Sequence, residues 1–336
     1  MENYKAILDS LHEFPVQDRN RDILIIDGLN TLLRAFVAVK LVNVKGNNVG
    51  GISGFLKSLG ALRRQFNPSR IIIAWDGKGG ATNRKHINSN YKAQRVQSGV
   101  IHWDMYDDKE EEMKSIHDQG ERLVDYLSCL PVTYVKIDKL EADDIIAHMA
   151  LVAAKQGKHV TIVSMDKDFM QLISQNIDVY SPTKKTLYTY EKAVDFLGVL
   201  PENYNIVKAL VGDSSDNLDG IKGCGIKTLI KLFPKLTTDP TYSMQDLYDT
   251  CAANLGRKKL YATIIANWQK VEDNFKIMDL HETVLDDFEK KFPYTELKRP
   301  TPKLRIGHFM SLMEQDYMPN LTNDDESWLI DFSNLS

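Results

Sequence analysis

Residues 22–28 read Asp-Ile-Leu-Ile-Ile-Asp-Gly, a short apolar run that ends in an aspartate and a glycine. A run of this length with this ending predicts a buried strand. The pattern returns at residues 70–77, Arg-Ile-Ile-Ile-Ala-Trp-Asp-Gly, and at residues 159–166, His-Val-Thr-Ile-Val-Ser-Met-Asp. Apolar residues at helical spacing lie between these runs, over residues 50–66 and 140–155. Strands that alternate with helices predict an α/β fold, with a mostly parallel central sheet flanked by helices.

Composition and periodicity change along the chain and divide it into four parts. We expect an N-terminal extension over residues 1–20 and an α/β core over residues 21–190. The pattern then becomes helical with glycine-rich turns, which predicts a helical subdomain over residues 191–280. Residues 281–336 are less regular and end in an acidic, aromatic tail. Within the core, residues 78–117 are too long for an ordinary connection and predict a mobile segment.

The bulk composition excludes several classes of protein. No apolar run reaches membrane-spanning length, and the first 20 residues lack the apolar stretch of a secretory signal. Cys129, Cys224 and Cys251 lie far apart, so neither a disulfide framework nor a thiolate zinc site is indicated. The net charge of −4 is not that of a simple nucleic-acid binder, but carboxylates gathered round metal ions would leave the rest of the surface more basic. We expect a cytoplasmic monomer with no membrane partner.

Three aspartates, Asp27, Asp76 and Asp166, each follow one of the predicted strands. Any one of them alone is better explained as a turn residue, since Asp-Gly and Asp-Lys-Asp are common after strands. Ligand sites of open parallel sheets, however, form outside the carboxyl ends of the strands. Three aspartates at equivalent places in one sheet therefore favour a shared site.

Two further acidic motifs follow along the chain. Glu141-Ala-Asp143-Asp144 opens a predicted helix, where acidic residues are often only caps or dipole partners. Asp213 and Asp216 lie three apart in the polar loop Gly-Asp-Ser-Ser-Asp-Asn, which alone would be a capping turn. Beside a cluster of strand-end aspartates, both motifs gain weight as parts of one site.

Carboxylates that converge without a metal ion would repel one another and raise each other's pKa values. Oxygen ligands without a cysteine or histidine pair favour Mg²⁺, with Mn²⁺ as a substitute, over zinc. Two such ions about 4 Å apart clamp the attacking and leaving oxygens of a phosphoryl displacement. The candidate metal ligands are Asp27, Asp76, Glu141, Asp143, Asp144, Asp166, Asp168, Asp213 and Asp216.

Together these motifs resemble the structure-specific 5′-nuclease family, which includes flap endonucleases, the 5′-nuclease domain of bacterial DNA polymerase I and stand-alone phage enzymes. The matching pieces cover roughly residues 21–280 in the family's order and are individually weak but specific as a set. They are Ile26-Asp27-Gly28 with Arg34 seven residues after the aspartate, Trp75-Asp76-Gly77, Tyr91-Lys92-x-x-Arg95, Glu141-Ala-Asp143-Asp144, Ser164-Met-Asp166-Lys-Asp168 and Gly212-Asp213-Ser-Ser-Asp216-Asn217.

The resemblance implies a division of the carboxylates between two metal ions. It places Asp27, Asp76, Glu141, Asp143 and Asp166 round the first ion. It places Asp168, Asp213 and Asp216 at the second ion, with Asp144 near both.

The segment after Asp76 is basic at first. Without the family, a solvated charged loop explains Arg84, Lys85, Lys92 and Arg95 equally well. The resemblance makes this segment a gateway over the active site, in which Lys92 and Arg95 are catalytic and hold the scissile phosphate. Arg34, outside this segment, is implied to be catalytic as well. It also implies that Arg84 and Lys85 contact nucleic acid and that Tyr91 stacks on a terminal base. The acidic run over residues 103–112 departs from this pattern and does not favour phosphate contact.

Residues 220–228, Gly-Ile-Lys-Gly-Cys-Gly-Ile-Lys-Thr, have the pattern of a helix–hairpin–helix. Glycines let a backbone turn approach phosphate, and the next helix offers free N–H donors. A plain interhelical turn is the alternative. In relatives this motif grips duplex DNA, often with a bound K⁺. The residues concerned are Gly220, Lys222, Gly223, Gly225, Lys227 and Thr228.

The function implied is a Mg²⁺-dependent 5′-3′ exonuclease or flap endonuclease of replication or repair, with a phage enzyme that removes RNA primers as the nearest analogy. Its partners would be branched or nicked duplex DNA and RNA–DNA hybrids with 5′ ends. The apolar tail over residues 328–332 fits docking on a replication protein, or packing on its own domain.

Three alternatives explain the sequence less completely. A catalytically silent DNA-structure binder would have lost metal ligands, and a PIN-like ribonuclease is shorter and lacks the motifs after residue 212. A phosphatase with an Asp-x-Asp nucleophile would carry that motif near its first strand and a hydroxyl residue after it, where this chain has Phe169.

Overall fold

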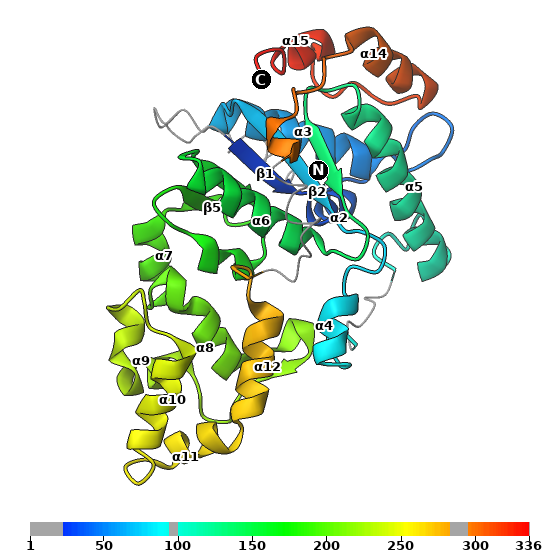
Figure 1. Ribbon diagram of the computed structural model, residues 1–336. Coiled ribbons are helices and arrows are strands. Elements are labelled where there is room, and N and C mark those ends of the chain that lie inside the picture. Colours follow the sequence, from blue (N-terminus) through cyan, green and yellow to red (C-terminus); the bar gives the residue numbers. More distant parts are fainter. Residues whose placement is uncertain (1–22, 94–99, 283–294, 336) are drawn as a thin grey trace.

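The computed structural model describes residues 23–93, 100–282 and 295–335. Its centre is a six-stranded sheet in the order β3–β2–β1–β4–β5–β6 (Figure 1). β1 to β5 pair in parallel, and only β6 is antiparallel to its neighbour. The strands are β1 (Ile23–Asp27), β2 (Arg70–Trp75), β3 (Thr133–Lys136), β4 (Val160–Val163), β5 (Ile177–Ser181) and β6 (Thr186–Tyr188). The predicted α/β fold with a mostly parallel sheet is confirmed.

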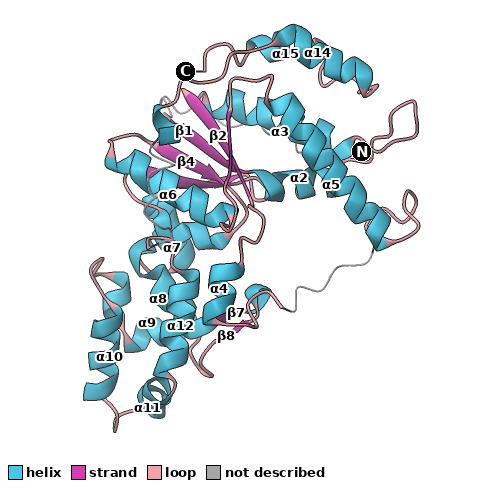
Figure 2. Ribbon diagram, turned by 45° about the vertical axis from the view of Figure 1, so that its right-hand side comes forward, coloured by secondary structure: helices cyan, strands magenta, loops and turns pink. Residues whose placement is uncertain are grey.

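The sheet is covered on both faces, and the alternation along β1 shows why (Figure 2). Leu24 and Ile26 belong to a cluster with residues of α3 (Gly50–Phe66) and α5 (Lys109–Leu127). Ile23 and Ile25 point to the other face and pack with α6 (Ala142–Lys155). Because neighbouring side chains of a strand point to opposite faces, a continuous apolar run is needed when both faces are buried.

The strand order reverses at β1, since β2 and β3 lie on one side of it and β4 and β5 on the other. Ligands of open α/β sheets bind at such a switch point, outside the carboxyl ends of the strands. β1 ends at Asp27, from which α2 (Gly28–Ala38) starts, and β4 is followed by Asp166 and the 3₁₀ helix η1 (Lys167–Leu172). The fold therefore brings the strand-end aspartates to one edge.

The segment over residues 78–117 contains more regular structure than its weak periodicity indicates. It holds α4 (Thr82–Ile87) and the first two turns of α5, which begins at Lys109 rather than at residue 116 as its apolar pattern predicts. Asp108 caps this helix by accepting a hydrogen bond from Glu111 N, and the acidic residues that follow favour a helix N-terminus. Much of the acidic run is thus the beginning of a helix. Arg95 lies outside the described residues.

Helices dominate after β6 and occupy the lower part of Figure 1. They share a hydrophobic cluster with the α6 face of the sheet, so they pack directly on the core. A two-stranded ribbon of β7 (Gly212–Asp213) and β8 (Leu218–Asp219) interrupts them. The elements are α7 (Tyr190–Leu197), η2 (Pro201–Asn203), α8 (Tyr204–Val211), η3 (Ser214–Asp216), α9 (Ile226–Leu232), η4 (Pro234–Thr237), α10 (Met244–Ala253), α11 (Lys259–Ala266) and α12 (Trp268–Met278).

The C-terminal segment packs on its own domain, which decides between the two interpretations of the tail. It forms α14 (Ile306–Gln315) and α15 (Asp325–Ile330), which lie over α3 and α5 (Figure 1). Trp328 is 2% exposed and Phe332 is fully buried, so neither is offered to a partner. The predicted extension over residues 1–20 lies outside the described residues. Within the described part of the chain, no helix has the length and apolar character needed to cross a membrane.

Candidate active site

The three strand-end aspartates lie at the same edge of the sheet and accept hydrogen bonds from neutral groups. Asp27 accepts from Asn30 N at 3.1 Å and from Ser164 Oγ at 3.2 Å. Asp76 accepts from Ala142 N, the first residue of α6, at 2.8 Å. Burial, together with the nearby carboxylates of Asp76 and Asp166, raises the pKa of Asp27 to about 6 against the hydrogen bonds from Asn30 and Ser164, which lower it. These three side chains are therefore near enough for Asp76 and Asp166 to act electrostatically on Asp27.

Arg84 belongs to α4 and packs against the start of α6, where two of the predicted metal ligands hold it. Its guanidinium is 2.5 Å from Glu141 Oε2 and 2.7 Å from Asp144 Oδ1. Its Nε donates to the backbone oxygen of Ile277 at 2.9 Å, and the residue is only 7% exposed. Arg84 is therefore buried in this structure and is not exposed for the contact to nucleic acid that was expected. Arg84 is an internal counter-cation of the carboxylates, because a buried acidic pair needs a partner charge.

Tyr91 and Lys92 also turn toward Glu141. The Tyr91 hydroxyl donates to Glu141 Oε2 at 3.1 Å, and its ring is 2% exposed within the core, so it is not free to stack on a base as expected. The Lys92 ammonium pairs with Glu141 Oε1. Burial alone would raise the pKa of Glu141, but Arg84 and Lys92 lower it below its usual value. Lys85, by contrast, is exposed.

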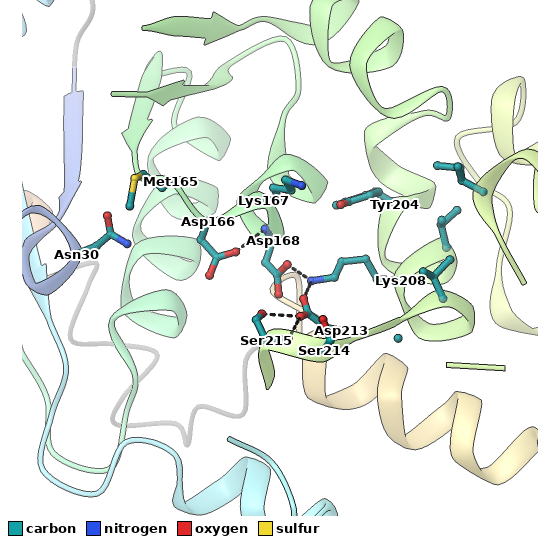
Figure 3. Close-up of a pocket in the computed structure, with 14 residues that line it drawn as sticks. Asn30, Met165, Asp166, Lys167, Asp168, Tyr204, Lys208, Asp213, Ser214 and Ser215 are labelled. Atoms are coloured by element: carbon teal, nitrogen blue, oxygen red, sulfur yellow. Dashed lines mark hydrogen bonds and ion pairs between the residues drawn. The ribbon is translucent and has the colours of Figure 1, made fainter. Parts of the chain in front are cut away.

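A second group of charges surrounds Lys208, which comes from α8 (Figure 3). Its ammonium contacts Asp168 Oδ1 and lies 2.8 Å from Asp213 Oδ2. These residues line a cavity of about 630 Å³, together with Asn30, Asp166 and other side chains.

Burial raises the pKa of Asp168 to about 6 in spite of Lys208. Burial acts in the same sense on Asp213, but the hydrogen bond from Lys208 lowers its pKa to about 2. The two carboxylates share one cation, and their pKa values differ because Asp168 is the more buried of the two. Burial, with Asp166 as the nearest like charge, raises the pKa of Asp143 as well.

The carboxylates share one edge of the fold, but their side chains are turned toward the chain's own cations. Over the described ranges, no three His, Cys, Asp or Glu side chains are arranged to hold a metal ion as they stand. Carboxylate oxygens of Glu141 and Asp168 instead form ion pairs with Arg84, Lys92 and Lys208. The donor set nevertheless fits hard divalent cations, since it consists of carboxylate oxygens without a thiolate and lies in a region with excess negative charge.

Lys208 is the site residue that sequence reasoning missed. It stands in α8 in the stretch Ile206-Val-Lys-Ala-Leu-Val211, five residues before Asp213. The available signal was a lysine among the apolar residues of a predicted helix, because a lysine is rarely buried without a partner. In the structure Lys208 is 7% exposed. Arg34, which was expected at the site, lies on α2 near Tyr180 of β5 and opposes the rise that burial causes in the pKa of that tyrosine.

The glycine-rich turn lies between β8 and α9. A side chain at Gly220 would collide with Val211 O, at 1.9 Å from the Cβ position, and Gly223 has a φ of +94° that favours glycine. Gly225 caps α9, and its carbonyl accepts from Thr228 N at 2.8 Å. The side chains of Lys222, Lys227 and Thr228 are exposed on this turn and on the first turn of α9. The turn therefore presents two cations and open backbone to the solvent.

Comparisons with known proteins agree with this geometry. The family model described as "5'-3' exonuclease, N-terminal resolvase-like domain" matches residues 22–198. The chain is 31% identical over 216 residues to a 5′-3′ exonuclease of Aquifex aeolicus, which covers 64% of this chain and 70% of that protein. It is also 31% identical over 228 residues to a 5′-3′ exonuclease of Bacillus subtilis, covering 65% and 72% of the two chains.

A solved structure shares the fold across most of the chain. It is the bacteriophage T5 D15 flap endonuclease in a complex with DNA and metal ions, with a TM-score of 0.63 and 18% identity. The match covers 88% of this chain and 99% of that one. The strand-end carboxylates, the sheet topology and the family match lead to one assignment: the chain belongs to the 5′-3′ exonuclease family.

Proposed function

We propose that this chain is a metal-dependent 5′-nuclease that hydrolyses phosphodiester bonds at the 5′ ends and branch points of DNA and RNA–DNA duplexes. The observation that carries the proposal is a set of carboxylates from distant parts of the sequence at one sheet edge. Asp166 lies close enough to Asp27 to raise its pKa. Asp168 and Asp213 share the ammonium of Lys208. Such a cluster is costly to bury unless cations bind it, which supports a catalytic rather than a structural role.

Two Mg²⁺ ions, with Mn²⁺ as a substitute, fit the donor set. Ions of this kind supply a water of lowered pKa and stabilise charge on the leaving oxygen. We assign Asp27, Asp76, Glu141, Asp143 and Asp166 to the first ion. Asp168, Asp213 and Asp216 belong to the second, with Asp144 near both.

Residues of the chain itself position the substrate. The ammonium of Lys92 is paired with Glu141 in this structure. It would turn toward the scissile phosphate and contact it once a metal ion neutralises Glu141. Arg95 is proposed to contact the same phosphate, and Arg34 is proposed as a further catalytic residue. The exposed Lys222 and Lys227 on the glycine-rich turn would contact the duplex backbone, and K⁺ would bind at that turn. Because backbone contacts carry little base sequence information, DNA structure would then direct cutting.

The biological setting proposed is DNA replication or repair, including the removal of RNA primers in the manner of a phage enzyme. We propose a cytoplasmic monomer. The motif over residues 212–217 and the turn that follows it favour this function over a PIN-like ribonuclease. The complete set of carboxylates favours it over a silent DNA-structure binder.

The test uses Asp76→Asn. An asparagine keeps an oxygen for the hydrogen bond from Ala142 N, so the fold and DNA binding should persist while cleavage falls to background. A 5′-labelled flap, a nicked duplex and an RNA–DNA hybrid are digested in parallel with Mg²⁺, and product lengths are read. Asp195→Asn, at an exposed position of α7, is the matched control and should cut like the wild type. A wild-type chain that binds the flap without cutting any substrate would identify a silent binder.

A further inference from the structure

The buried ammonium of Lys208 stands between two predicted ligands of the second metal ion. It contacts Asp168 Oδ1 and lies 2.8 Å from Asp213 Oδ2, and its side chain is 8% exposed. Asp168 follows β4 and Asp213 belongs to β7, so the lysine joins two distant segments. Figure 3 shows the ammonium pointing between both carboxylates.

The strand-end aspartates proposed to bind the first ion have partners of a different kind. Across the described part of the chain, the hydrogen bonds of Asp27, Asp76 and Asp166 come from neutral N–H and O–H donors. The cations near that position, Arg84 and Lys92, bind the carboxylates of α6 instead. Among the residues that the structure describes, the strand-end aspartates therefore have no cation paired with them, whereas Asp168 and Asp213 share Lys208.

A purely structural ion pair would not explain the arrangement well. Two carboxylates and one ammonium leave an excess negative charge, and Asp166 also faces the same cavity of about 630 Å³. Burying such a group is expensive unless its remaining charge is compensated. The cavity also has walls formed by Tyr204, Val211 and Ile226, beside which the flexible lysine stem can move.

We infer that Lys208 is a counter-cation that occupies the second metal position in the metal-free protein, so that the second ion must displace its ammonium to bind. This inference rests on the proposed metal-dependent nuclease. Among the described residues, the first ion meets such competition only at Glu141, one of its five proposed ligands. Two of the second ion's three proposed ligands are paired with Lys208. The second ion accordingly binds more weakly, and the two sites fill in sequence.

The experiment measures metal binding and not cleavage. The full chain, stripped with EDTA, is titrated with Mn²⁺, and free Mn²⁺ is followed by electron paramagnetic resonance. The wild type should show one tight and one weaker ion. Lys208→Met, which keeps the apolar stem and removes the charge, should tighten the weaker ion by roughly tenfold or more, the scale on which one neighbouring charge acts at a partly exposed site.

Two control variants separate the charge from other effects. Lys208→Arg keeps the cation and should bind Mn²⁺ like the wild type. Lys235→Met removes one exposed lysine, 62% exposed in its side chain, and should also leave both affinities unchanged. Because Lys208→Met leaves two partly buried carboxylates unpaired, it should melt at a lower temperature in EDTA and gain more from Mn²⁺ than the wild type does.

The outcomes separate the two proposals. If the wild type binds two ions equally tightly, or if Lys208→Met binds the second ion no better, the role of Lys208 is refuted and the nuclease proposal stands. If no variant binds Mn²⁺, the metal-dependent function fails as well. Should Lys208→Met not fold, the wild type and Lys208→Arg still decide, because equal affinities in the wild type contradict the inference.

Discussion

At the scale of single residues, the site is a balance between acidic side chains and three basic ones. Arg84, Lys92 and Lys208 each take a place that a metal ion or a phosphate could take. Arg84 is the most firmly held, because its planar guanidinium reaches Glu141, Asp144 and a backbone oxygen at once. Its role is to keep the start of α6 in place.

Arg84→Met should therefore destabilise the protein, since it leaves Asp144 buried without its cation and Glu141 paired with Lys92 alone. Removing one partner of a buried ion pair costs about 3–5 kcal/mol. The free energy of unfolding, measured in urea with EDTA present, gives the size of the loss. Lys85→Met, at the exposed neighbouring position, should change it little. An unchanged stability of Arg84→Met would show that these ion pairs contribute nothing.

The raised pKa of Asp27 predicts a pH dependence of the metal-free protein. Its pKa rises from 3.8 to about 6, so the folded state holds this proton more tightly than the unfolded state does. The resulting stability is complete below pH 3.8 and is lost as the pH rises through about 6. A shift of this size corresponds to roughly 3 kcal/mol.

The measurement compares wild type with Asp27→Asn in EDTA between pH 4 and pH 7.5. The stability of the wild type should fall relative to the variant over that range. Stabilisation of the wild type by Mg²⁺ should instead grow from pH 5 to pH 7.5, because the ion displaces a proton below about pH 6. A stabilisation by Mg²⁺ that does not change with pH would contradict the assignment of Asp27.

At the scale of elements, the chemistry lies at the ends of strands and helices. Asp27 ends β1 and caps α2, and Asp76 follows β2 and caps α6. Helix N-termini favour negative charge, so each aspartate is compatible with its helix. Asp27 accepts from α2 through Oδ1 and from Ser164 through Oδ2. The glycine-rich turn before α9 is arranged differently, with positive charge and open backbone facing outward.

Lys222→Ala together with Lys227→Ala should weaken duplex binding without changing the chemical step. Each lysine that neutralises a phosphate adds about 0.9 to the slope of log affinity against log salt for duplex DNA, so the double variant should have a slope shallower by nearly 2. Binding of a nicked duplex at several salt concentrations, with Ca²⁺ in place of Mg²⁺, measures this slope. Lys235→Ala is the control. An unaltered slope would remove the turn from the DNA interface.

At the scale of the whole molecule, two hydrophobic clusters divide the structure along the sheet. One joins the α6 face to the helices that carry Lys208 and the glycine-rich turn. The other joins the α3 and α5 face to the C-terminal segment, where Trp328 packs against Phe309 and Phe332. Gly60 allows this packing, because its Cβ position is 2.0 Å from Trp328 Nε1.

Trp328→Ala should destabilise the protein by about 3–5 kcal/mol, the range for truncating a large buried aromatic side chain. The edge proposed to bind metal ions lies elsewhere, so specific activity at low temperature should be retained. Urea unfolding with and without Mg²⁺ measures the loss. Ile330→Ala, at a position 56% exposed in the same helix, should have little effect. Equal stability of both variants would show that the tail adds nothing to the core.

The sequence by itself determined the parallel sheet, because apolar runs followed by Asp-Gly admit few other structures. It also placed Asp27, Asp76 and Asp166 at the ends of strands, because the end of a strand follows from the local pattern. Only the tertiary structure decided which charges meet. Arg84 and Tyr91 are buried where exposed contacts were expected, and Lys208 bridges two carboxylates. The physical reason is that the role of a charge depends on its burial and on its neighbours in space, and neither follows from local periodicity.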